Sequence, residues 1–133
     1  MAVEDLQKNA MMAHLLGALE AGHDIGHYGR LVFAMVARHF LTEDELLTCL
    51  HKNPHFSAEE ARALCRQVQE RDYNPPRRDR ILEWQAHQDF PICPTPEDPD
   101  ACNVYKDLQF PESIYQHITD YHEQKTSDEK GSD

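Results

Sequence analysis

The sequence predicts an all-α protein, a compact multi-helix domain with one long irregular loop rich in proline and cysteine. Apolar residues recur at helical spacing in most segments up to Trp84, and no segment shows the alternation of apolar and polar residues that is typical of a strand. The chain has 133 residues, which is enough for one domain with a core. We expect a single helical domain over residues 1–124 and a disordered acidic tail over residues 125–133.

The first two predicted helices span residues 4–20 and 25–40. Apolar residues of the first fall on one helical face, and Gly22 follows it as a stop signal. The second segment is apolar almost all round, which is typical of a central helix packed on several sides.

Two further helices are predicted over residues 43–52 and 58–71. Each begins with a capping-box sequence, Thr42-Glu-Asp-Glu45 and Ser57-Ala-Glu-Glu60, in which a hydroxyl and a carboxylate three residues later satisfy free backbone N–H groups. Pro54 disfavours helix at the residue before it, so a tight connection is expected between the two helices.

A short helix over residues 77–86 would bury Ile81 and Trp84, and Pro75-Pro76 would start it because proline at the first helical position loses no hydrogen bond. A last helix is predicted over residues 111–124. Prolines punctuate the irregular run between the two: Pro91, Pro94, Pro96, Pro99 and Pro111. Such a long irregular run is uncommon unless a ligand, a metal or a partner holds it.

The composition and charge of the chain limit the classes of protein to which it can belong. No apolar run reaches the length of about 18 residues that a membrane span needs, and the first residues lack the basic flank of a signal peptide, so we expect a soluble cytoplasmic protein without a membrane partner. The net charge of −11 argues against strong non-specific nucleic-acid binding. Residues 73–90 nevertheless carry a local group of arginines: Arg77, Arg78 and Arg80.

The four cysteines fall into two groups. Cys49 and Cys65 lie beside apolar helical positions, where free cysteine packs like a small hydrophobic residue. Cys93 and Cys102 lie in the proline-rich loop, a setting typical of metal or cluster sites. Two thiols are only half of a closed four-ligand site.

Histidine and aspartate near the start of the second helix suggest another chemistry. His23, Asp24 and His27, with His14 upstream, suggest a metal-dependent hydrolase, but such a site needs further ligands that the sequence does not indicate. No phosphate-binding loop, nucleophile elbow or zinc-protease motif is present. We therefore expect no catalytic activity and keep the hydrolase as a lesser alternative.

Several short motifs occur together in a particular order. His27-Tyr-Gly-Arg30 opens an apolar helix, Asp72-Tyr-Asn-Pro75 follows two helices later, and then come Cys93-Pro94 and Cys102. Over roughly residues 11–118 this order resembles the C-terminal iron–sulfur domain of the archaeal and eukaryotic DNA primase large subunit. The resemblance implies a helical domain that binds a template–primer junction.

The chain departs from that family at two of the four cysteines that hold the cluster. The resemblance places the first at Met11 and the second at Arg78, while Cys93 and Cys102 correspond to the third and fourth. We therefore expect no iron–sulfur cluster and no other cofactor. Met11 would fill apolar space, and Arg78 would turn outward or pair with a carboxylate, because a buried unpaired guanidinium is costly. The candidate partners are Asp79, Glu83 and Asp89.

The resemblance implies that His27 and Arg30 lie near phosphates, and the arginine group would add positive charge. The expected function is accessory binding of nucleic acid, a primer–template or a single strand of DNA or RNA, weakly and in a salt-sensitive way. A purely structural role also stays open, with His27 exposed and Arg30 paired with Asp24. The main alternative is a degenerate helical module that binds a protein partner through the acidic segment from Glu97 onward.

Overall fold

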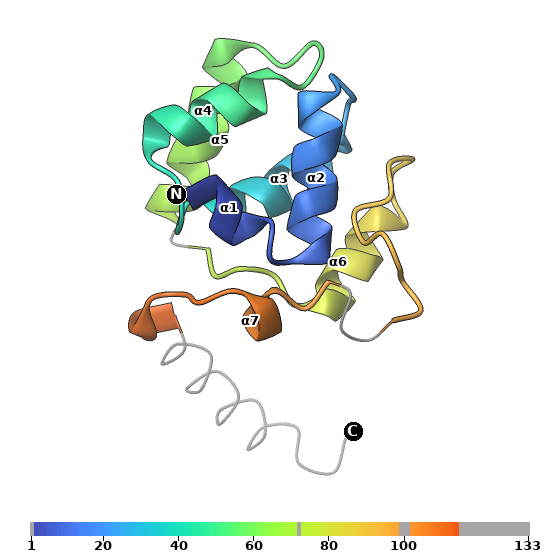
Figure 1. Ribbon diagram of the computed structural model, residues 1–133. Helices are drawn as coiled ribbons and strands as arrows, with labels where there is room; N and C mark the ends of the chain where they lie inside the picture. Colours follow the sequence, from blue (N-terminus) through green and yellow to red (C-terminus); the bar gives the residue numbers. More distant parts are fainter. Residues whose placement is uncertain (1, 72, 99–101, 115–133) are drawn as a thin grey trace.

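The computed structural model describes residues 2–71, 73–98 and 102–114, and this part of the chain is helical without strands, as predicted. Helices are joined by short turns up to residue 71 and by irregular segments after it (Figure 1). The helices are α1 (Ala2–Leu6), α2 (Ala10–Glu20), α3 (Gly26–Ala37), α4 (Glu43–His51), α5 (Ala58–Glu70), α6 (Arg78–Gln85) and α7 (Val104–Asp107).

A break at Asn9 divides the first predicted helix into α1 and α2. The Asn9 side chain accepts a hydrogen bond from the Met12 N–H at 3.0 Å and so caps α2. The same side chain donates to Asp107 at 3.0 Å, although Asn9 is fully buried. The expectation of one continuous helix over residues 4–20 was therefore wrong, because a distant partner favours an internal cap.

Helix α3 is the central helix, as its all-round apolar sequence predicted. It packs against α2, α4, α5 and α6. Val32, Phe33, Ala34, Val36 and Ala37 have no exposed surface. Gly22 ends the preceding turn with a φ of 77°, as a glycine stop signal predicts.

Both capping boxes form as predicted. The Thr42 and Ser57 hydroxyls accept from the backbone N–H groups of Glu45 and Glu60, and each glutamate accepts from the backbone of its cap residue. The α4–α5 connection is anchored by Asn53, which is only 2% exposed and accepts from the Ile25 N–H at 2.9 Å. This bond ties the α4–α5 turn to the start of α3.

The region from residue 73 onward has less helix than expected. Residues 73–77 are extended and α6 begins at Arg78, so Pro75-Pro76 precede the Arg77 cap instead of opening the helix. An unpredicted short helix, α7, follows the proline-rich loop. Of the predicted helix 111–124, residues 112–114 are helical, while its remainder and the predicted tail lie outside the described residues.

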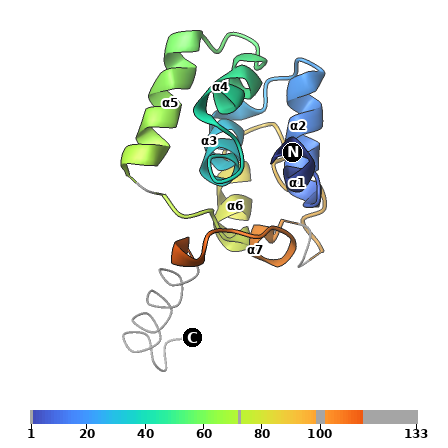
Figure 2. The same ribbon diagram turned by 60° about the vertical axis from the view of Figure 1, so that its left-hand side comes forward.

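Helices α1 to α5 form a bundle, and α6 and α7 lie below it in the view of Figure 2. Figure 2 shows α6 beneath α3, with α7 beside α6 and α5 on the opposite side of the bundle from α2. A main core joins residues of α1 to α6 with Ile92, Cys93, Cys102 and Val104. A smaller apolar cluster of Ala34, Met35 and Val68 lies between α3 and α5 and contacts Tyr73 and Trp84. No described helix is long and apolar enough to cross a bilayer.

Candidate functional site

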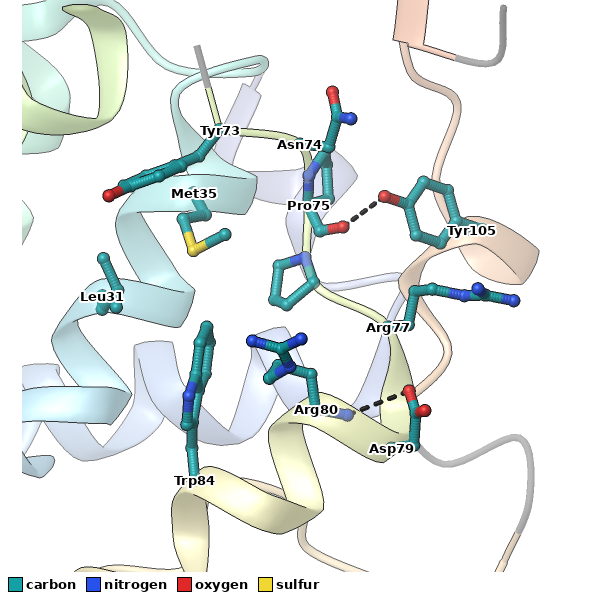
Figure 3. A pocket seen from close by; sticks show the side chains of 11 residues that line it. Leu31, Met35, Tyr73, Asn74, Pro75, Arg77, Asp79, Arg80, Trp84 and Tyr105 are labelled. Carbon is teal, nitrogen blue, oxygen red and sulfur yellow. Dashed lines mark hydrogen bonds between the residues drawn. The ribbon is translucent and has the colours of Figure 1, made fainter. Parts of the chain in front are cut away.

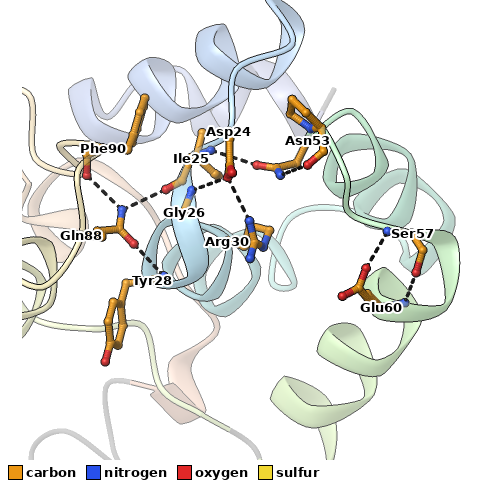
Figure 4. A network of polar contacts seen from close by, with 11 residues as sticks. Asp24, Ile25, Gly26, Tyr28, Arg30, Asn53, Ser57, Glu60, Gln88 and Phe90 are labelled. Carbon is orange, nitrogen blue, oxygen red and sulfur yellow. Dashed lines mark hydrogen bonds and ion pairs between the residues drawn. The ribbon is translucent and has the colours of Figure 1, made fainter.

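The start of α3 is held by a polar network around Asp24 (Figure 4). Asp24 accepts from the Gly26 N–H at 2.9 Å and pairs with Arg30 at 3.1 Å. The pKa of Asp24 is lowered, first by the Gly26 hydrogen bond and to a lesser degree by Asn53 and Arg30. Arg30 also lies 4.5 Å above the Phe56 ring, and its side chain is only 18% exposed. Its guanidinium is therefore already engaged within the protein.

Gln88 connects the α6 side of the molecule to the start of α3. Its Oε1 accepts from the Tyr28 N–H, and its Nε2 donates to the carbonyls of Ile25 and Phe90, each at 2.9 Å. The backbone of Gly26 passes directly against this amide, with φ at 81°. These bonds fix the position from which Tyr28 projects (Figure 4).

A row of stacked side chains runs from the start of α3 onto α6. His27 meets Tyr28 edge to face at 5.1 Å between ring centroids, and Tyr28 stacks on Trp84 at 5.6 Å with planes 17° apart. The Arg80 guanidinium lies 5.9 Å from the Trp84 ring centroid. We call these four residues, His27, Tyr28, Trp84 and Arg80, the aromatic row. Because Tyr28 and Trp84 are half-buried and His27 and Arg80 are exposed, the row reaches solvent at both ends.

A cavity of about 460 Å³ opens beside the Arg80 end of this row (Figure 3). Its apolar side is formed by Leu31 and Met35 of α3, and Trp84 and Tyr73 stand on either side of them. Pro75-Pro76, Asn74, Arg77, Asp79, Arg80 and Tyr105 complete the lining. This volume falls within the range of about 300–1,000 Å³ that is usual for small-molecule sites.

The extended segment on one side of the cavity is fixed at two carbonyl groups. Arg38 donates to the Tyr73 carbonyl at 2.9 Å, and the Tyr105 hydroxyl donates to the Pro75 carbonyl. Proline restricts the backbone of the same segment. The wall formed by residues 73–77 is therefore set before any ligand arrives.

The three arginines of the predicted basic group point in different directions. Arg77 extends outward near Tyr105, and Arg80 lies along Trp84 (Figure 3). Arg80 pairs with Glu83 at 3.7 Å, an exposed contact that binds weakly. Arg78 is directed elsewhere: it donates to the Pro96 carbonyl of the proline-rich loop. Arg77 and Arg80 thus line the cavity and Arg78 does not.

The expected pairing of Arg78 with Asp79, Glu83 or Asp89 was wrong. Asp79 accepts from the Arg80 backbone N–H and Glu83 binds the Arg80 side chain, while Arg78 remains half-buried under the loop. Neighbouring helical residues and residues five apart do not face each other, so neither Asp79 nor Glu83 shares a face with Arg78. The Arg78 Nε is buried and has no hydrogen-bond partner in the described part of the chain.

Three of the four positions that the resemblance assigned to a former cluster lie close together, namely Arg78, Cys93 and Cys102. Met11, Cys93 and Cys102 are fully buried members of the main core. Burial first, and then a hydrogen bond with Cys93, raises the pKa of Cys102 to about 12, while the nearby charge of Arg78 acts in the opposite direction. Cys93 and Cys102 therefore form a contacting pair next to Arg78. Cys49 and Cys65 are buried on helix faces, as predicted.

The residues proposed for a metal-dependent hydrolase do not assemble a site. Within residues 2–71, 73–98 and 102–114 no group of three or more His, Cys, Asp or Glu side chains could hold a metal ion. Asp24 accepts hydrogen bonds from the Gly26 N–H and from the Arg30 side chain, and the His27 ring contacts the Tyr28 ring. His14 stacks on Phe90 at 5.1 Å and bonds the Pro91 carbonyl at 2.8 Å. The hydrolase alternative therefore lacks its metal ligands in the described part of the chain.

Sequence reasoning identified the charged residues of this surface but not its aromatic ones. Tyr28 and Tyr73 were quoted only as parts of motifs, Tyr105 was not mentioned, and Trp84 was assigned to the core although it is half-buried. The one available signal was that Tyr73 and the only tryptophan, Trp84, flank the arginine group in sequence. Comparisons of the chain with protein-family models, with curated proteins and with solved structures find no match.

Proposed function

We propose that this protein is an accessory, non-catalytic domain that binds nucleic acid, either a primer–template or a single strand, through the aromatic row and the adjoining cavity. The observation that carries this proposal is the placement of Arg77 and Arg80 beside a cavity walled by Trp84 and Tyr73. Proteins that bind single strands combine cationic side chains for the phosphates with aromatic side chains on which bases stack. The resemblance to the primase domain supports the same class of ligand.

The set of contacting residues is smaller than the sequence suggested. Arg30 is held by Asp24 and Phe56, and Arg78 by the proline-rich loop, so their charges are partly satisfied within the protein. Arg77 has no ion pair in the described part of the chain, and the Arg80 pair with Glu83 is exposed. We assign the phosphate contacts to Arg77 and Arg80, with His27 at the far end of the row.

The overall charge sets the strength of this binding. With a net charge of −11 the protein repels polyanions at long range, so binding depends on the few local arginines and is weak. Each phosphate neutralised on a single strand contributes about −0.7 to the slope of log affinity against log salt concentration. Two arginine contacts therefore give a slope of about −1.4.

The test is fluorescence anisotropy of a labelled single-stranded oligonucleotide and a primed template, measured over a series of salt concentrations. We expect weak binding at low salt, and Arg77→Ala or Arg80→Ala should each lower affinity and reduce the salt slope by about half. Arg62→Ala is the matched control, because it removes the same charge from an exposed site on α5. An equal loss from Arg62→Ala would show that only net charge matters and would contradict the proposed site.

The alternative is a protein-interaction module that uses the acidic segment beginning at Glu97. Glu97 and Asp98 are exposed, and they lie on the proline-rich loop rather than at the cavity. Absence of oligonucleotide binding at low salt would overturn the nucleic-acid proposal and favour this alternative.

A further inference from the structure

The cavity beside the aromatic row has a shape and a lining that suit one class of ligand group. Its inner side is apolar, formed by Leu31 and Met35, and the flat side chains of Tyr73 and Trp84 flank this surface (Figure 3). The charged side chains of Arg77, Asp79 and Arg80 are exposed and lie on the α6 side. A ligand that fills it should be flat and apolar on its faces and joined to an anionic group.

The Trp84 ring already contacts two other side chains of the row. Tyr28 stacks on it at 5.6 Å between ring centroids, and the Arg80 guanidinium lies over it at 5.9 Å from its centroid. Tyr28 is fixed from behind by the Gln88 hydrogen bond to its backbone, whereas Arg80 is exposed and held only by a surface ion pair. The position that Arg80 occupies over Trp84 is therefore the one that a ligand can take over, with Arg80 moving to the ligand's phosphate.

We infer that this cavity takes one unstacked nucleobase, which lies against Trp84 between Tyr73 and Arg80, so that the protein selects single strands over duplex. The inference rests on the proposed function and specifies its ligand. A paired base in a duplex keeps both faces stacked and cannot enter, whereas a base in a single strand enters at the small cost of leaving its neighbours. Arg77 and Arg80 then contact the phosphates on either side of the inserted nucleotide.

The experiment compares three labelled nucleic acids of equal length: a single strand, the same strand with abasic residues, and the duplex. We expect the full chain to bind the base-containing strand about fivefold or more tightly than either of the others, because stacking of a base on an aromatic side chain typically contributes at least that factor. Trp84 is the only tryptophan, so its fluorescence should change with the base-containing strand and not with the abasic one.

Two variants locate the base. Tyr73→Ala removes one wall of the cavity, and Trp84→Leu removes the stacking surface while retaining an apolar side chain. Each should lower affinity for the base-containing strand more than affinity for the abasic strand, so that the ratio between the two affinities falls toward one. Circular dichroism checks folding, and because Tyr73 is half-exposed its variant keeps the test valid if Trp84→Leu does not fold.

The outcomes separate this inference from the proposed function. Equal affinity for base-containing and abasic strands overturns the inference and leaves phosphate binding through Arg77 and Arg80 in place. A base preference that survives both Tyr73→Ala and Trp84→Leu places the base elsewhere and also overturns it. No binding of any strand at low salt overturns both.

Discussion

Replacement of Gly26 by alanine should destabilise the protein far more than a single methyl group suggests. Gly26 has a φ of 81°, a conformation that residues with a side chain rarely adopt. A Cβ at this position would lie 2.5 Å from the Gln88 Oε1 and 2.6 Å from its Nε2. The Gln88 amide would have to move, and it could not then keep its bonds to Tyr28, Ile25 and Phe90.

The magnitude follows from two separate costs. The backbone conformation costs a residue with a Cβ about 1–2 kcal/mol. Loss of the three Gln88 hydrogen bonds adds about 1 kcal/mol for each. We expect Gly26→Ala to lower the free energy of unfolding by about 4–5 kcal/mol, a large part of the stability of an ordinary domain.

Gly22 provides a matched control, because it has a similar φ of 77° and no atom within 4 Å of its added Cβ. Gly22→Ala should therefore cost only the backbone term of about 1–2 kcal/mol. Urea denaturation followed by far-ultraviolet circular dichroism gives both values. In a Gln88→Ala background Gly26→Ala should cost no more than Gly22→Ala. If Gly26→Ala and Gly22→Ala are equally destabilising in the otherwise unchanged protein, the role assigned to Gln88 is wrong.

Two further predictions concern the helix caps and the buried thiols. Ser57→Ala should lower the free energy of unfolding by about 1 kcal/mol in urea denaturation, because the capping box of α5 loses its hydroxyl acceptor; a change below a few tenths would contradict the box. Burial raises the pKa of Cys102 from 9.0 to about 12, so its stabilising effect is complete below pH 9 and lost as pH rises toward 12. Unfolding free energy measured from pH 8 to 10.5 should therefore fall less steeply in Cys102→Ala than in the unchanged protein; equal slopes would refute this.

The helices that could be predicted are those whose signals are local. The capping boxes at Thr42 and Ser57 fix the starts of α4 and α5 with atoms only three residues apart, and both form. The break at Asn9 could not be predicted, because Asn9 is stabilised there by Asp107 from the other end of the fold. Pro75-Pro76 correctly indicated that a helix follows, but the helix begins later than predicted. Residues 73–77 stay extended because Arg38 and Tyr105 donate hydrogen bonds to their carbonyl groups.

The candidate site was predictable only in part for the same reason. The arginine group is visible in the sequence, but the direction of each side chain depends on the start of α6, which sends Arg78 toward Pro96 and leaves Arg77 and Arg80 at the cavity. The stack of Tyr28 on Trp84 joins residues on two helices that cross in space. No local pattern encodes that crossing, so the aromatic row could be found only in three dimensions.

The hydrogen bond from Asn9 to Asp107 has a consequence for synthesis of the chain on the ribosome. The two residues are 98 positions apart, so Asn9 waits for its partner for roughly 5–20 s at elongation rates of about 5–20 residues per second. During that interval α2 can form beside α3, and the Asn9 side chain can accept its hydrogen bond from Met12 of the same helix. The NH2 group of Asn9, which is fully buried in the folded protein, still lacks its acceptor on Asp107. The nascent chain should therefore stay open around Asn9, and accessible to chaperones, until α7 leaves the exit tunnel and closes the core.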